Sequence, residues 1–139
     1  MNNQFRWYIV VGAILIQLAL GAIYAWSVFT PLLIDPHGYY QFSAQQAAWI
    51  FSTGLAVFAG TMVIAGKLQQ LLGPRPVAIL GGIFLGAGYM CGGLFGSDFF
   101  TQLICIGIIG GMGIGLAYVV PIAVGVKWFP DKKGMITGL

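Results

Sequence analysis

The chain has 139 residues and a formal net charge of +3 at pH 7, with 59% hydrophobic and only 6% charged residues. Soluble domains average about 45–50% apolar and about 25% charged residues, so this composition excludes an ordinary soluble domain. The basic charge does not indicate nucleic-acid binding, because that function needs a basic face on a soluble module. Cys91 and Cys105 both lie in apolar segments, so neither a disulfide framework nor a metal site is expected.

Four long segments carry no charged residue: residues 7–34, 38–66, 76–97 and 99–126. Each is long enough to cross about 30 Å of hydrocarbon as a helix. We therefore predict an all-α membrane protein with spans at residues 7–30, 44–66, 76–96 and 99–126, and a fifth span that starts after residue 134. The first segment is longer than the apolar core of about 7–15 residues in a removable signal peptide, so it is expected to be retained.

Prolines and capping residues mark the expected ends of these helices. The first helix is expected to end at Pro31, and Pro121 predicts a kink inside the fourth. Ser43 and Gln46 have the capping-box spacing and predict the start of the second span. The link from Gly66 to Pro76 is short and contains Gly73-Pro74, so the second and third spans should be antiparallel neighbours.

The charged residues separate by sign across the predicted spans. All 6 Lys and Arg residues fall at the N-terminus or after the second and fourth spans: Arg6, Lys67, Arg75, Lys127, Lys132 and Lys133. The opposite loops carry only Asp35, His37 and Asp98. By the positive-inside rule, we expect a multi-pass protein of the cell (inner) membrane with a cytoplasmic N-terminus and the lipid bilayer as its partner.

Glycine is frequent, with 22 residues, and many glycines within the spans are four residues apart. The pairs are Gly82 and Gly86, Gly88 and Gly92, Gly107 and Gly111, and Gly111 and Gly115. Such spacing lets helix backbones approach closely, so packing explains these glycines. A phosphate-binding loop is excluded, because the glycines lie in apolar spans rather than between a strand and a helix.

Few polar side chains lie within the spans, and they define the candidate site. Two similar segments, Gly21-Ala-Ile-Tyr24 and Gly115-Leu-Ala-Tyr118, run in opposite directions across the membrane. Secondary transporters contain inverted repeats of this kind, with substrate sites near the bilayer midplane. We therefore expect Tyr24 and Tyr118 to flank a substrate site, with Gln17 on the same helix face as Tyr24. The alternative is an interfacial or packing role for the tyrosines.

No group of residues suggests catalysis. The single histidine, His37, lies in an outer loop without an acidic partner at helical spacing, so no enzyme, cofactor or metal centre is expected. The four spans contain no charged side chain. A cation that pairs with an anionic substrate is therefore expected in a downstream part of the protein.

Two segments resemble the major facilitator superfamily, specifically the oxalate/formate antiporter family, with monocarboxylate porters as the nearest alternative. Residues 21–31 resemble the first-helix signature, which implies that Tyr24 lies beside the substrate cavity. Residues 127–134 resemble the run that introduces the fifth helix in this family. The matching residues are Trp128, Pro130, Lys132, Lys133 and Gly134.

The link between the second and third spans resembles the gating loop of the superfamily only in part. Gly66, Gly73 and Arg75 fit the pattern. Gln70 stands where the family has an aspartate, and Leu71 replaces the first basic residue. The charge-based gate expected of this loop is therefore weakened.

The resemblance implies that residues 1–139 form part of the N-terminal six-helix bundle of a transporter, with the C-terminal half as the missing partner. The implied function is secondary transport of small organic anions, such as oxalate, formate or pyruvate, by alternating access. In this family Tyr118 would lie beside the bound anion. The alternative is a non-transporting membrane subunit or sensor whose glycine-rich helices are assembly surfaces.

Overall fold

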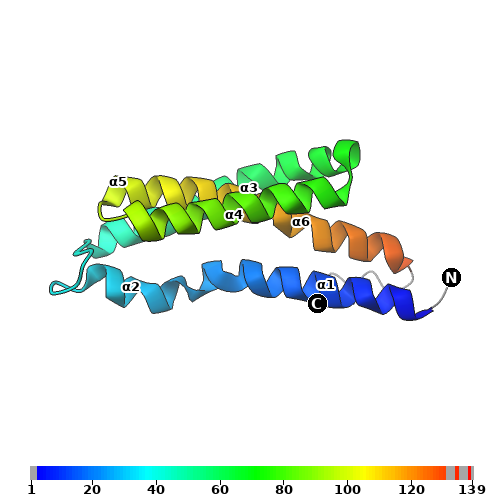
Figure 1. The fold of residues 1–139 in the computed structure, drawn as a ribbon, viewed down its shortest axis with the longest axis horizontal. Helices are drawn as coiled ribbons and strands as arrows, with labels where there is room; N and C mark the ends of the chain where they lie inside the picture. The colour runs from blue at the N-terminus through cyan, green and yellow to red at the C-terminus, as the bar shows by residue number, and fades with distance from the viewer. Residues whose placement is uncertain (1–2, 131–133, 135–137, 139) are drawn as a thin grey trace.

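Figure 1 shows an all-helical structure whose long helices run along the long axis of the molecule. The computed structural model describes residues 3–130, 134 and 138. In chain order the elements are α1 (Asn3–Leu20), the 3₁₀ segment η1 (Gly21–Ala25), α2 (Trp26–Ile34), α3 (Ala44–Leu72), α4 (Pro74–Phe95), α5 (Phe99–Gln102), the π-helical segment η2 (Leu103–Gly110) and α6 (Gly111–Trp128). Four described segments are long and apolar enough to cross a membrane: Trp7–Ile34, Ala44–Leu72, Pro74–Phe95 and Phe99–Trp128. The predicted fold class, an all-α protein with four long apolar helices, is confirmed.

The first span is interrupted in its middle rather than ended at Pro31. The expectation that the helix ends there is wrong, because α2 continues through this proline to Ile34. Pro31 has no N–H for the Ser27 carbonyl four residues earlier, a gap that membrane helices tolerate. In the preceding turn, Thr30 Oγ1 donates to the Trp26 carbonyl oxygen over 2.8 Å. Regular α-helix stops instead at Gly21–Ala25, which forms a 3₁₀ turn. Glycine costs a helix interior about 0.8–1.0 kcal/mol relative to alanine, so the first residue of this turn weakens the α-helix.

α3 begins at the cap that the sequence predicts and continues to Leu72, past the expected end of the span at Gly66. Ser43 Oγ accepts from the Gln46 N–H over 3.1 Å, and Gln46 Oε1 accepts from the Ser43 N–H over 2.9 Å, which completes the predicted capping box. At the other end, Gly73 has φ +86° and Pro74 begins α4. This backbone conformation favours glycine. The short link makes α3 and α4 antiparallel neighbours, as predicted (Figure 1).

Glycines bring the backbone of the fourth span against α3 and α4. A Cβ atom built at Gly111 would lie 2.8 Å from a carbonyl oxygen of α3. A Cβ atom at Gly88 would lie 2.6 Å from the Cys105 carbonyl oxygen. These positions cannot hold a larger residue without movement, so the predicted close packing is confirmed for them. At Gly82 and Gly86 the described residues leave open space around the Cβ positions, so close packing at this pair stays a prediction.

The fourth span is the most buried of the four, and its first half departs from α-helical geometry. Leu103–Gly110 forms a π-helix between α5 and α6. Pro121, where a kink is expected, is buried inside α6, which runs to Trp128; the kink itself stays a prediction. The irregular backbone in both the first and the fourth span is notable, because π-helical segments are frequent at functional sites. These two spans also carry the predicted site residues.

Candidate functional site

A cavity of about 240 Å³ lies between the first span, α3 and α6. Its lining residues are Gln17, Leu20, Gly21, Ile23, Tyr24, Leu55, Phe58, Ile114 and Tyr118. The structure therefore brings the three predicted site residues, Gln17, Tyr24 and Tyr118, together in one cavity. The cavity is smaller than the roughly 300–1,000 Å³ typical of sites for drug-sized ligands, so its size suits a small molecule.

Gln17 contributes an amide group to the cavity wall from α1. Its Oε1 atom is buried and has no hydrogen-bond partner among the described residues. Leaving a buried acceptor unpaired costs roughly 1–3 kcal/mol, and unpaired groups in native proteins call for an explanation. A polar ligand or a water molecule would satisfy this amide. Gln69 and Gln102 also have an unpaired Oε1 atom, so the case for Gln17 as a binding residue comes from its place in the cavity wall.

Tyr24 projects from η1, the 3₁₀ turn in the middle of the first span. Side chains three residues apart share a face of a 3₁₀ turn, and Gly21 and Tyr24 both line the cavity. No described atom lies within 4 Å of the Cβ position of Gly21, which leaves space beside the tyrosine. Tyr24 is 72% exposed, so its ring is open to contact with a ligand.

Tyr118 lies on α6 and is half-buried. Its ring meets the ring of Phe58 edge to face, with centroids 5.3 Å apart and an interplanar angle of 83°. Both rings pack against the cluster of buried apolar residues Leu20, Ile114 and Ala117. The described residues provide no hydrogen-bond partner for the Tyr118 hydroxyl. Ring contacts therefore hold the Tyr118 side chain, and its hydroxyl can form a hydrogen bond with a ligand.

α3 contributes two lining residues that the sequence did not identify, Leu55 and Phe58. The only available signal was the glycine pattern of the fourth span. A Cβ atom at Gly115 would lie 2.8 Å from the Phe58 carbonyl oxygen, so this glycine brings α3 to the cavity. In an apolar span, the sequence does not show whether an apolar residue lines a cavity or faces lipid.

The cavity combines hydrogen-bonding groups with an apolar wall and no formal charge. The polar groups are two phenols and an amide, and the remaining lining residues are apolar or glycine. Phenol and amide N–H groups can donate to a carboxylate or carbonyl oxygen. Within the described part of the chain, no group of three or more His, Cys, Asp or Glu side chains could hold a metal ion. The arrangement therefore suits reversible binding of a small polar molecule.

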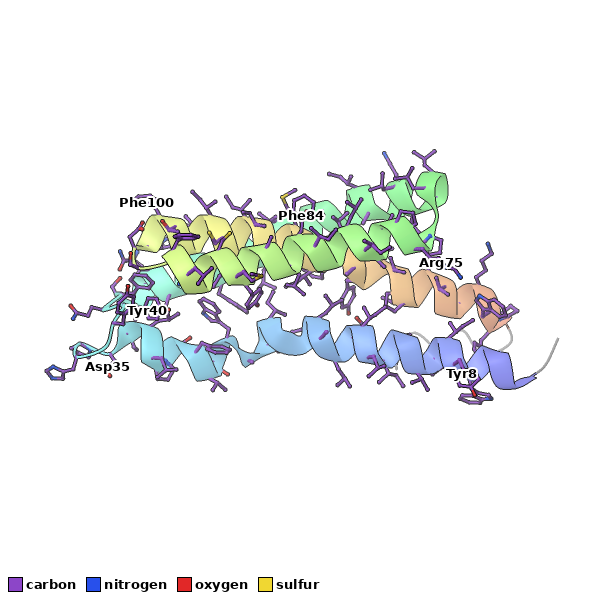
Figure 2. All side chains as sticks on the ribbon, viewed as in Figure 1. Tyr8, Asp35, Tyr40, Arg75, Phe84 and Phe100 are labelled. Carbon is purple, nitrogen blue, oxygen red and sulfur yellow. The ribbon has the colours of Figure 1, made fainter. Side chains whose placement is uncertain are left out.

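The residues that resemble the gating loop lie at one end of the bundle. Gly66 lies in α3 with open space at its Cβ position, and Gly73 follows the end of that helix. Arg75 is exposed in the first turn of α4. Figure 2 shows Arg75 at the same end of the molecule as Tyr8, with Asp35 at the opposite end. Arg75 is thus far in space from the loop that carries Asp35.

The residues after the fourth span are described only in part. Trp128 is the last residue of α6, and Pro130 and Gly134 are exposed. Lys132 and Lys133 lie outside the described residues. α6 runs antiparallel to α4, so Trp128 lies toward the end of the bundle where α4 begins (Figure 1).

The sequence profile of the Major Facilitator Superfamily matches residues 6–139. The chain is 35% identical over 142 residues to the uncharacterized MFS-type transporter YhjX of Escherichia coli (strain K12), which covers 97% of the chain and 33% of that relative. It is 33% identical over 92 residues to apicoplast pyruvate carrier 1 of Toxoplasma gondii, covering 66% of the chain and 17% of the relative. It is 28% identical over 134 residues to the oxalate:formate antiporter of Oxalobacter formigenes, covering 96% and 31% respectively. The chain spans about a third or less of the length of these curated relatives. On the profile match, the chain belongs to the major facilitator superfamily of membrane transporters.

Proposed function

We propose that the full-length protein carries small organic anions across the membrane by alternating access, and that this cavity is the N-terminal side of its substrate site. The observation that carries the proposal is the meeting of Gln17, Tyr24 and Tyr118, from the first and fourth spans, in one cavity. Polar side chains in otherwise apolar spans generally face a substrate pathway rather than lipid. Substrate sites of secondary transporters lie near the midplane between repeats, where we place this cavity.

The anionic class of substrate is supported by the relatives and by the chemistry of the cavity. Two relatives are a pyruvate carrier and an oxalate:formate antiporter by name. Phenol and amide donors suit carboxylate oxygens, but a desolvated anion also needs a charged partner. Because no lining residue is charged, we propose that the C-terminal half of the transporter supplies this cation. Oxalate, formate and pyruvate are the first anions to test.

We further propose that the end of the bundle that carries Arg75 faces the cytoplasm of a cell (inner) membrane, together with the N-terminus. The distribution of Lys and Arg between the loops supports this orientation. Two segments would then contribute to the cytoplasmic gate: the loop with Gly66, Gly73 and Arg75, and the segment with Lys132 and Lys133. With Gln70 in place of an aspartate, this gate depends less on ion pairs.

A membrane subunit or sensor without transport activity is the second candidate function. Gly82 and Gly86 favour it, because no described atom lies within 4 Å of their Cβ positions and this face of α4 is free for assembly. Transport is favoured by the superfamily match and by the cavity. Exchange of a substrate by the purified protein separates the two candidates.

Substitution of Tyr118 in the full-length protein, reconstituted in proteoliposomes, tests the proposed site. Hydrogen bonds to charged groups contribute about 1.5–3 kcal/mol, so Tyr118→Phe should raise the KM for organic-anion counterflow by roughly tenfold or more. Tyr118→Ala should lower counterflow further while expression persists. Tyr39→Phe is the control, since Tyr39 is 78% exposed in the outer loop and does not line the cavity. Unchanged counterflow in both Tyr118 variants would remove this residue from the site.

A further inference from the structure

Phe58 and Tyr118 form a defined pair of rings at the wall of the cavity. Their centroids are 5.3 Å apart and their planes are at 83°, which is an edge-to-face contact. Such a contact favours one ring arrangement by roughly twofold to tenfold beyond simple burial. Because the two rings are in contact and both line the cavity, the Phe58 ring limits how far the Tyr118 side chain can turn about its Cα–Cβ bond, and that turn sets where the hydroxyl lies.

The backbone beneath this ring pair is held by glycine contacts. A Cβ atom at Gly115, one helical turn before Tyr118, would lie 2.7 Å from Thr61 Cβ and 2.8 Å from the Phe58 carbonyl oxygen. The backbones of α3 and α6 therefore touch directly beside the two rings. Close-packed interiors deform little, so Phe58 is presented to Tyr118 from a fixed support.

No hydrogen bond from a described residue competes with the ring contact in orienting Tyr118. The ring also packs against Leu20, Ile114 and Ala117, whose apolar side chains form no hydrogen bond with it. Its hydroxyl has no partner among the described residues. The edge-to-face contact with Phe58 is thus the directional interaction on this side chain.

We propose that Phe58 is a positioning residue, which holds the Tyr118 ring so that the phenol hydroxyl stays directed to the substrate. The inference rests on the proposed function, in which Tyr118 binds the organic anion. It assigns to α3 a role in substrate affinity although α3 supplies no polar group to the cavity. Phe58 acts through Tyr118, so removing the hydroxyl should remove most of the effect of Phe58.

Counterflow by the full-length protein in proteoliposomes, with oxalate, formate and pyruvate as probes, tests this dependence. Phe58→Leu should raise the KM roughly threefold to tenfold and change the maximal rate by less than about twofold. Phe58→Tyr, which keeps the ring, should stay within about twofold of the original KM. In the Tyr118→Phe background, Phe58→Leu should add less than about twofold. Equal effects of Phe58→Leu in both backgrounds would overturn the proposal.

A matched control and a second measurement separate positioning from general loss of packing. Phe84→Leu is the control, because Phe84 packs against the cluster of Ala65, Val77, Leu116 and Val120 and does not line the cavity. With 3-fluorotyrosine at position 118, Phe58→Leu should shift or broaden the ¹⁹F resonance, and Phe84→Leu should leave it unchanged. An unchanged resonance in Phe58→Leu would overturn the positioning role. Absence of counterflow in the unsubstituted protein would overturn the proposed function instead, while the ¹⁹F result still decides the role of Phe58.

Discussion

Individual side chains at the turn between α4 and α5 decide how the fourth span begins. Asp98 Oδ2 accepts from the Thr101 N–H over 3.1 Å, and Asp98 Oδ1 accepts from the Thr101 hydroxyl over 2.6 Å. Gln102 then donates from Nε2 to the carbonyl oxygens of Gly92 and Gly96, over 3.1 and 3.0 Å. The first bonds cap α5, and the second pair ties it to the end of α4, where the Gly92 carbonyl oxygen also accepts from the Gly96 N–H over 3.1 Å.

The cap at Asp98 should make the stability of the protein depend on pH in the acid range. The hydrogen bonds from the Thr101 side chain and backbone hold the pKa of Asp98 below its ordinary value. A group with a depressed pKa stabilises the folded state above its unfolded pKa of about 3.9, and this stabilisation is lost as the pH falls through the folded pKa. Asp98→Ala should therefore lower the Tm at pH 7 and reduce the drop in Tm between pH 7 and about pH 3.

Thermal unfolding of the full-length protein in detergent, measured at several pH values, checks this expectation. Asp98→Asn is the control, because asparagine also caps helices but has no carboxylate to protonate. It should keep most of the Tm at pH 7 and show the same reduced acid sensitivity as Asp98→Ala. Parallel curves of Tm against pH for all three proteins would show that Asp98 does not contribute.

Residue chemistry explains which parts of the cavity could be predicted from the sequence. Gln17, Tyr24 and Tyr118 are conspicuous because polar groups are rare in spans that avoid unpaired hydrogen-bonding groups. The structure brings them to one cavity, and their role in substrate binding stays a prediction. Leu55 and Phe58 could not be found, because an apolar side chain looks the same whether it faces lipid, core or cavity.

The four long helices could be predicted because charged residues are excluded from the hydrocarbon core. The irregular turns inside the first and fourth spans could not. The uncharged segments predicted the four long helices, and Ser43 with Gln46 predicted the start of α3. The π-helical segment η2 consists of small and apolar residues like its surroundings, and in the 3₁₀ turn η1 only Tyr24 differs from them, so neither composition marks a change of helix type. The helix end expected at Pro31 was wrong, because a membrane helix can continue through a proline when other groups satisfy the backbone groups that the proline leaves unpaired.

The turn between α3 and α4 should depend on Gly73 for its backbone conformation. With φ +86° and ψ 170°, this residue lies in a region that is open essentially to glycine alone. Gly73→Ala should destabilise the protein by roughly 1–3 kcal/mol. Gly66→Ala is the matched control within α3, where the new methyl group meets open space and alanine favours the helix by up to about 1 kcal/mol.

Reversible unfolding of full-length protein in mixed detergent and SDS measures both changes. The same variants show whether this loop also gates transport. If Gly73→Ala and Gly66→Ala change the free energy of unfolding equally, the strained turn is not the reason for the glycine at position 73.

At the scale of the whole molecule, the first span packs against α6 near its middle, and the cavity lies beside this contact. Leu20 packs with Ile114 and Ala117 near the middle, and Trp7 meets Phe129 edge-on at a centroid distance of 5.9 Å where α1 starts and α6 has ended. Many large apolar side chains remain exposed on all spans. In the proposed transporter, lipid and the remaining helices cover these surfaces, and the second half of the protein closes the cavity.

The central claim is that this cavity belongs to a transporter of small organic anions, and counterflow tests it most directly. Proteoliposomes that contain the full-length protein are loaded with unlabelled oxalate, formate or pyruvate, and uptake of the same labelled anion is measured. We expect transient accumulation of at least one of the three anions above the level in protein-free liposomes. Failure to accumulate any of them, with protein that shows cooperative thermal unfolding, would contradict the account.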